Sequence, residues 1–88
     1  MSAEILIIDD NADIRSILKD LIDDAGFKTR VAANYSQALA EIDKKLPDVA
    51  IIDVKLDKGD NDGIELLSHI KKKNKDIPVI LISGHANI

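Results

Sequence analysis

The sequence predicts an α/β fold built on a doubly wound parallel sheet, and two features of the chain support this prediction. Apolar runs without polar alternation recur at 5–8, 49–52 and 79–82, and such runs are typical of strands that are covered on both faces. The segments between the runs carry apolar residues three and four positions apart, which is the pattern of amphipathic helices. Strands that alternate with helices in this way form parallel βαβ units with right-handed crossovers.

Each predicted element has its own boundary signals. Gly26 follows the last apolar position of the first helix, where glycine is favoured as a C-terminal cap. Asn34 and Gln37 have the spacing of a capping box at the start of the second helix, and Pro47 stands just beyond its end. In chain order we expect a strand at 4–8, a helix at 11–25, a strand at 27–33, a helix at 34–46, a strand at 48–53, a helix at 63–73 and a strand at 79–83.

Length and composition limit the classes of protein to which the chain can belong. Its 88 residues suffice for one small domain, 1–88, without a linker. The net charge of -4 and the pI of about 5.0 argue against direct contact with nucleic acid, because such binding needs a basic surface. The apolar runs are far shorter than the roughly 20 residues that cross a bilayer, and no secretory signal opens the chain. Since the sequence also has no cysteine, we expect a cytoplasmic protein without membrane contact.

Polar residues stand where the predicted strands end. Asp9 and Asp10 follow the first strand, Asp53 ends the third, and Ser83 ends the fourth. Parallel strands point their carboxyl ends to one edge of the sheet, and ligands of such sheets bind there. Three converging carboxylates repel one another unless a cation compensates them. Oxygen ligands without histidine or cysteine select a hard ion, and Mg²⁺ shared with a phosphoryl oxygen is the best match.

Four motifs together resemble the receiver domain of two-component response regulators. They are "IIDDN" at 7–11, "DVAIIDV" at 48–54, "DGIELL" at 62–67 and "PVILISG" at 78–84. An acidic pair, an aspartate at a strand end and a later hydroxyl residue, in this order, form a specific signal together. The long loop after Asp53, which has no proline, and the segment "ISGHANI" at 82–88 resemble the NtrX type of regulator.

The resemblance implies a flavodoxin-like receiver fold with strand order 2-1-3-4-5, and a role in signal transduction rather than in enzymatic turnover. Asp53 is similar in position to the phosphoacceptor, which takes a phosphoryl group from a sensor histidine kinase. The modified domain then switches an output domain that regulates transcription. Ser83 is similar to the switch hydroxyl that bonds the new phosphoryl group, and Gly84 to the small residue beside it.

The resemblance also implies a set of magnesium ligands. Asp10, Asp53 and the backbone carbonyl of Lys55 resemble the direct ligands, and Asp9 resembles the residue that holds the metal through water. A carboxylate that attacks a phosphoryl group must overcome charge repulsion, and the cation neutralises this repulsion.

The chain departs from a complete receiver, which has a fifth strand, a fifth helix and a lysine that pairs with the phosphoryl group. None of these is present in the 88 residues, so we expect a receiver domain that is incomplete at its C-terminus. Without a fifth strand, the strand at 79–83 is an edge, and exposed apolar edges recruit partners. We therefore expect self-association, as a homodimer, through this edge.

Two other functions fit parts of the pattern. A phosphorylation-incompetent, receiver-like interaction domain would share the fold without the chemistry. A fragment of an aspartate-nucleophile phosphatase would also use a strand-end aspartate and Mg²⁺, but it needs a second aspartate two residues after the nucleophile, where positions 11 and 55 carry Asn and Lys. A calcium loop starting at Asp57 is excluded because Asp62 stands where the glycine belongs. We expect His69 on a helix surface and His85 in a loop, neither with a partner that would make it a metal ligand or a base.

Overall fold

The computed structural model describes residues 3–57 and 59–82, and its elements follow the predicted order. They are β1 (Glu4–Ile8), α1 (Ala12–Asp24), β2 (Lys28–Ala32), α2 (Tyr35–Lys44), β3 (Val49–Asp53), α3 (Asp62–Lys73) and β4 (Val79–Ile82). All seven predicted elements are therefore confirmed. Their bounds agree with the predicted ones to within two residues, and α1 and α2 each begin one residue later than predicted because Asn11 and Asn34 are caps. None of the helices in the described part of the chain is long and apolar enough to cross a membrane.

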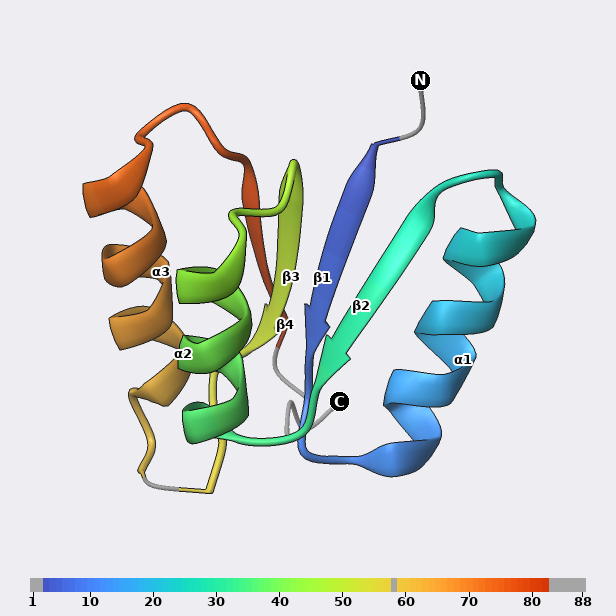
Figure 1. Ribbon diagram of the computed structural model, residues 1–88. Helices are drawn as coiled ribbons and strands as arrows, with labels where there is room; N and C mark the ends of the chain where they lie inside the picture. The colour runs from blue at the N-terminus through green and yellow to red at the C-terminus, as the bar shows by residue number, and fades with distance from the viewer. Residues whose placement is uncertain (1–2, 58, 83–88) are drawn as a thin grey trace.

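The four strands form one parallel sheet in the order β2-β1-β3-β4, which confirms the first four positions of the receiver order. Ile7 of β1 pairs with Val31 of β2 on one side and with Ile51 of β3 on the other. The helices lie in two layers: α2 and α3 cover one face of the sheet, and α1 stands alone against the other (Figure 1). This is the doubly wound arrangement that the alternating sequence pattern predicts.

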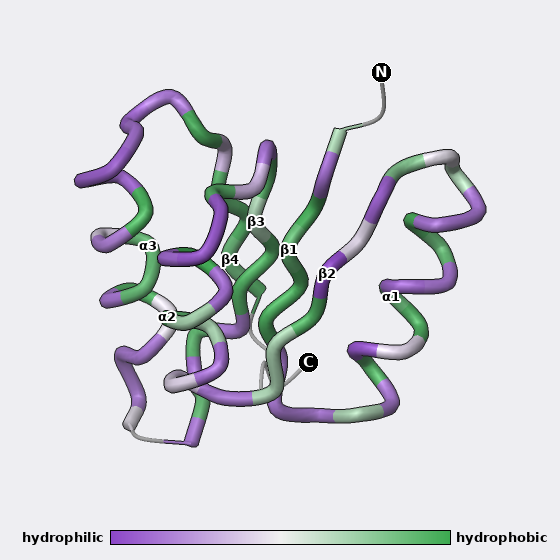
Figure 2. Tube along the Cα trace, viewed as in Figure 1, coloured by the Kyte–Doolittle hydropathy of each residue, from purple (hydrophilic) through white to green (hydrophobic). Residues whose placement is uncertain are grey.

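The main core lies between the sheet and the layer of α2 and α3. Alternate residues of the central strands point into it, and the hydropathy-coloured trace shows the apolar strands between more polar helices (Figure 2). Leu66 and Ile70 of α3 have no exposed surface and pack against these strands. The fully or nearly buried core residues are Leu6, Ile8, Ala32, Ala38, Ile42, Ala50, Ile52, Leu56, Leu66, Ile70 and Ile77.

The face covered by α1 is much less protected. Helix α1 contacts β2 and β1, and none of its residues is buried. Its side chains Ile17 and Leu21 are 59% and 62% exposed. Ile80 pairs with Ile51, so by strand alternation it points to the same side as α1, and it is 51% exposed. The half of this face over β3 and β4 therefore has no covering helix within residues 3–57 and 59–82.

The helix caps follow the sequence signals with one difference. The Asn11 side chain accepts hydrogen bonds from the amides of the first turn of α1, and Gly26 has the positive φ of 94° that favours glycine after a helix. The Asn34 side chain accepts from the Gln37 amide, as the capping box predicts, at 2.8 Å. The Gln37 side chain accepts from the amide of Ala33, one residue before the cap, rather than from Asn34 itself.

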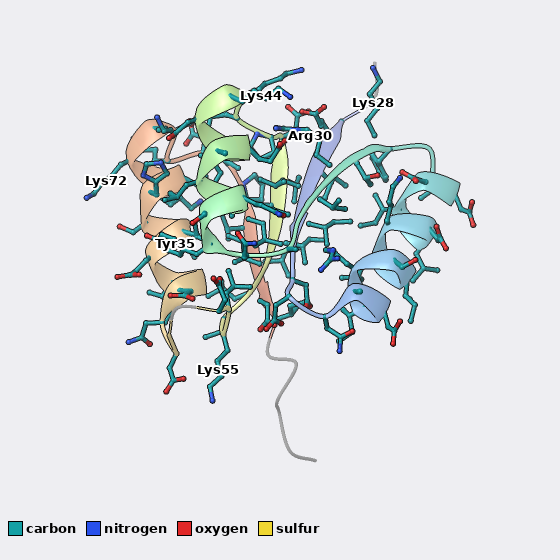
Figure 3. The ribbon with its side chains drawn as sticks, turned by 60° about the horizontal axis from the view of Figure 1, so that its bottom comes forward. Lys28, Arg30, Tyr35, Lys44, Lys55 and Lys72 are labelled. Atoms are coloured by element: carbon teal, nitrogen blue, oxygen red, sulfur yellow. The ribbon has the colours of Figure 1, made fainter. Side chains whose placement is uncertain are left out.

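Arg30 joins β2 to two other elements at the end of the sheet opposite to Lys55 (Figure 3). Its guanidinium donates to the Glu4 carboxylate of β1 at 3.0 Å and to the Glu41 carboxylate of α2 at 2.9 Å. It also donates to the backbone carbonyls of Glu41 and Lys45, which lie at the end of α2. One side chain that is 17% exposed thus satisfies two carboxylates and two carbonyls at the helix terminus.

Replacing Arg30 by methionine is expected to lower the free energy of unfolding by about 1–3 kcal/mol, because four acceptors lose a charged donor. Urea denaturation at fixed protein concentration measures the change. The control is Lys45→Met. Among the described residues the Lys45 ammonium pairs with Glu4 alone, at 3.9 Å, from a side chain that is 71% exposed, and exposed pairs contribute little. Equal changes in the two variants would contradict the role given to Arg30.

Candidate metal and phosphorylation site

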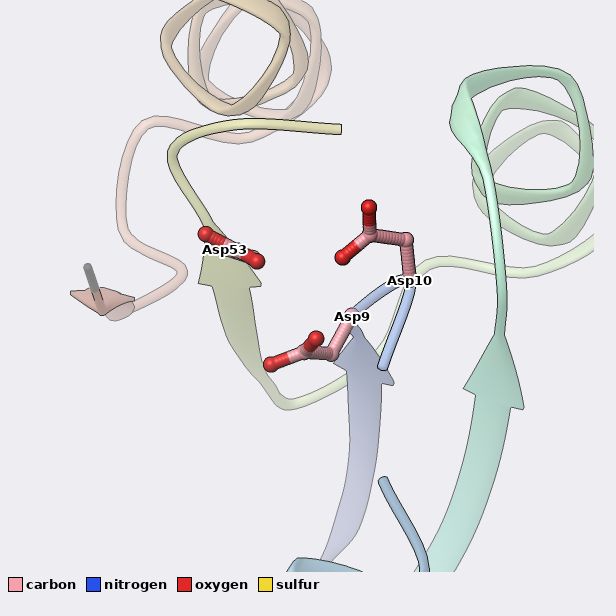
Figure 4. Close-up of side chains that lie close together, drawn as sticks. All are labelled: Asp9, Asp10 and Asp53. Carbon is pink, nitrogen blue, oxygen red and sulfur yellow. The ribbon is translucent and has the colours of Figure 1, made fainter. Parts of the chain in front are cut away.

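Three carboxylates converge at the carboxyl end of the two central strands. Asp9 and Asp10 follow β1, Asp53 is the last residue of β3, and β1 and β3 are neighbours in the sheet. One carboxylate oxygen from each residue lies within 4.8 Å of the others. Figure 4 shows the three side chains turned toward a common space. The parallel topology thus brings together groups that are more than 40 residues apart in the sequence.

Local hydrogen bonds fix the backbone of Asp9. Its amide donates to the carbonyl of Ala32 on β2 at 3.2 Å, which prolongs the strand pairing by one residue. Its Oδ1 accepts from the Asn11 amide at 2.8 Å, and this contact turns the chain from the strand into α1. Arg15, one helical turn later, donates to the Asp9 carbonyl at 2.8 Å. Asp9 is therefore held from three directions.

The second oxygen of Asp9 has no hydrogen-bond partner in the part of the chain that the structure describes. Asp9 has no exposed surface, and its Oδ2 is buried without a hydrogen bond among the described residues. Burial raises the pKa of Asp9 above its usual value, and the hydrogen bond from Asn11 opposes this rise only in part. The charges of Asp53 and Asp10 raise the pKa further. A buried carboxylate in this state needs either a proton or a cation.

Asp53 is buried and oriented by the loop that follows it. It is 2% exposed, and its Oδ1 accepts from the amide of Lys55 at 3.2 Å. The next amide, Val54 N–H, donates to the carbonyl of Ile82 on β4 at 2.9 Å. Asp10, in contrast, is exposed. The group therefore combines two buried carboxylates with one that faces solvent.

The chemistry of the three residues fits Mg²⁺. The donor set consists of oxygen atoms alone, which favours hard cations. Magnesium binds through one or two carboxylates and keeps open positions for water and phosphate. The unpartnered Oδ2 of Asp9 offers a further acceptor for such a hydrated ion.

Some of the predicted site residues cannot be placed. Ser83, Gly84 and His85 lie outside the described residues. The side chain of Lys55 lies 3.6 Å from the Asp60 carboxylate in the same loop, and nothing in the structure tests the assignment of its carbonyl as a metal ligand.

His69 lies on the surface of α3, as expected, and has a partner there that the sequence did not indicate. Its Nε2 lies 3.0 Å from Oδ1 of Asp43, across the contact between α3 and α2. Lys73 Nζ lies 3.4 Å from the same oxygen. The hydrogen bond from His69, with the smaller contribution of Lys73, lowers the pKa of Asp43. No sequence pattern predicts this pair, because the spacing of residues within one helix carries no information about contacts to another helix.

With the fold and the site established, the chain can be assigned to a class of protein. Residues 5–88 match the response regulator receiver domain family, and the chain belongs to this family of two-component signalling modules. Among proteins of known sequence, it is 40% identical over its full length to the nitrogen assimilation regulatory protein NtrX of Azorhizobium caulinodans, of which it spans 19%. The resemblance to NtrX-type regulators is thus confirmed.

Solved structures agree with this assignment. The chain superposes on NtrX from Brucella abortus with a TM-score of 0.86 and 40% identity, covering 99% of this chain and 19% of that one. It superposes on a CheY-like receiver domain from Methanospirillum hungatei with a TM-score of 0.88 and 28% identity, covering 100% of this chain and 69% of that one. The fold is therefore the receiver fold, and the chain spans about one fifth of the NtrX proteins that it resembles.

Proposed function

We propose that Asp53 accepts a phosphoryl group from a phosphohistidine of a sensor kinase in a Mg²⁺-dependent step. The observation that carries the proposal is the geometry of Asp53: a carboxylate that is 2% exposed, beside the buried carboxylate of Asp9, whose Oδ2 has no partner within residues 3–57 and 59–82. Membership of the receiver family supports the same step. The resulting acyl phosphate switches an output domain that regulates transcription, as the likeness to NtrX proteins suggests.

The residues of the chain have distinct parts in this proposal. Asp10, Asp53 and the carbonyl of Lys55 would hold Mg²⁺ directly, and Asp9 would hold it through water. When bound, the ion neutralises the charge of the transferring phosphoryl group. An Asp53 oxygen forms the new bond to phosphorus while the bond from phosphorus to the kinase imidazole breaks, and the imidazole leaves with its electron pair. Ser83 then bonds the phosphoryl group, and Gly84 leaves space beside it.

The orientation of Asp53 is supplied by its own loop. The Lys55 amide holds Oδ1, so the carboxylate does not have to be ordered during the reaction. Burial of the residue limits the access of water, which protects the acyl phosphate from hydrolysis.

Labelling with acetyl phosphate tests the proposal. The chain is expected to take up one phosphate per molecule when Mg²⁺ is present and none in EDTA. The Asp53→Asn variant, which keeps the size of the side chain, should take up none. Phosphate retained on Asp53→Ala would contradict the assignment, and a folded wild-type chain that takes up none would favour the phosphorylation-incompetent interaction domain.

The remaining parts of the proposal concern partners and location. The chain self-associates through the β4 edge, a point that is supported by the exposed Ile80 and Leu81, at 51% and 39%. It makes no direct contact with nucleic acid, in keeping with its net charge of -4. A cytoplasmic location fits the absence of cysteine.

A further inference from the structure

Gly63 lies directly against the end of the strand that carries Asp53. It is the second residue of α3, and its amide donates to the carbonyl of Val54 at 2.9 Å. A Cβ at this position would lie 2.4 Å from the carbonyl oxygen of Asp53 and 2.7 Å from Cα of Val54. Both neighbours are backbone atoms, so neither can rotate away as a side chain would.

The backbone conformation of Gly63 does not explain why glycine stands there. Gly26 is the only glycine with a positive φ in the described part of the chain. Gly63 therefore has a conformation that other residues adopt. Glycine is needed at this position because a residue without a side chain allows the first turn of α3 to approach the end of β3.

The atoms that Gly63 contacts determine where the Asp53 carboxylate lies. The Asp53 carbonyl and Val54 Cα belong to the peptide group that connects Asp53 to the loop. That loop supplies the Lys55 amide that holds Asp53 Oδ1 at 3.2 Å. A shift of this peptide group moves the carboxylate relative to Asp9 and Asp10, with which it shares a space only 4.8 Å across.

We infer that Gly63 is a positioning residue for Asp53, and that the absence of its side chain sets the geometry of both metal binding and phosphoryl transfer. The inference rests on the proposed function of Asp53. A Cβ needs about 3.5 Å to a neighbouring heavy atom, so Gly63→Ala forces the helix and the strand end apart by about 1 Å. Displacements of this size reduce reaction rates by up to about 100-fold.

Gly63→Ala is therefore expected to reduce the rate of labelling by acetyl phosphate 10- to 100-fold and to weaken the apparent Mg²⁺ affinity. Gly59→Ala is the matched control, because a Cβ there meets only Oδ1 of Asp62, at an ordinary 3.8 Å. Leu66→Ala is the second control, since it creates a cavity in the core one turn along the same helix. Rates are measured at saturating Mg²⁺ and are normalised to the folded fraction from circular dichroism.

A purely structural role of Gly63 would lower the melting temperature of Gly63→Ala, as in Leu66→Ala, and leave the normalised rate and the Mg²⁺ affinity unchanged. That result would overturn the inference. If the wild-type chain is not labelled, the proposed function fails instead, so the two failures can be told apart.

A measurement on the wild-type chain keeps the inference testable even if Gly63→Ala does not fold. Addition of Mg²⁺ is expected to shift the amide resonance of Gly63 in ¹H-¹⁵N spectra more than that of Gly59. The reason is that Gly63 N–H donates to the Val54 carbonyl, whose peptide group contains the Lys55 amide that holds Asp53. A Gly63 resonance that does not move while the Lys55 resonance does would overturn the coupling.

Discussion

Replacing Asp9 by asparagine is expected to raise the melting temperature of the metal-free chain and to abolish its further stabilisation by Mg²⁺. Asp9 is fully buried with an unpartnered oxygen, and a buried polar group of this kind costs about 1–3 kcal/mol. Asparagine removes the charge and can donate to a neighbouring carboxylate. For a domain of this size, 1 kcal/mol corresponds to about 4–8 °C in melting temperature.

The pH dependence of the stability of the metal-free chain measures the cost of the buried Asp9 carboxylate in a second way. The pKa of Asp9 in the folded state is raised above 3.8, first by burial. The folded state therefore binds the proton more tightly, and the contribution of Asp9 to stability is fully present below its unfolded pKa and lost as the pH rises through the folded value. In EDTA, wild-type stability should fall over this interval, and Asp9→Asn should remove that component of the fall.

Asp10→Asn is the matched variant, because Asp10 belongs to the same group but is exposed. It should lose at least tenfold in Mg²⁺ affinity while changing the metal-free melting temperature much less than Asp9→Asn does. Thermal melts in EDTA and across a Mg²⁺ titration measure both quantities. An unchanged magnesium affinity in Asp10→Asn would contradict the proposed metal site.

The contrast between Asp9 and Asp10 shows what the sequence could and could not predict. Strand-end positions and parallel topology were sufficient to predict that these carboxylates would meet Asp53. They could not predict which of the two adjacent aspartates is buried, because this depends on the turn that the Asn11 amide makes with Asp9 Oδ1. The difference decides which variant affects stability and which affects only the metal.

Contacts between distant elements were also beyond the sequence patterns. The amide of Tyr35 at the start of α2 donates to Oδ1 of Asp57 in the β3–α3 loop at 2.9 Å, and Arg30 joins β2 to the end of α2. Periodicity and capping signals describe one element at a time. They therefore predicted all seven elements, but not the side chains that fix the loop of Asp53 to its neighbours.

The exposed edge of the sheet at β4 is the surface where we expect a mutation to have its largest effect on self-association. Strand β4 is the last in the order, and the backbone groups on its outer side have no strand partner within residues 3–57 and 59–82. Ile80 is 51% exposed on the half of the sheet that α1 does not reach. Two copies that pair their β4 edges about a twofold axis perpendicular to the sheet would form a continuous eight-stranded sheet, with the two Ile80 side chains on the same face beside the new strand pair.

We therefore expect the wild-type chain to sediment as a dimer at micromolar concentration and Ile80→Lys to sediment as a monomer. Contact between the two Ile80 side chains beside this junction contributes about 1 kcal/mol per copy, and two lysines in their place would repel each other, so the dissociation constant should rise at least tenfold. Ile64→Lys is the control, because Ile64 is 48% exposed but lies on α3, on the opposite side of the sheet, and this variant should remain a dimer. A wild-type chain that is monomeric and melts cooperatively would show that the β4 edge and the α1-side face of the sheet need no partner. Loss of the dimer in both variants would show that the interface does not lie at the β4 edge.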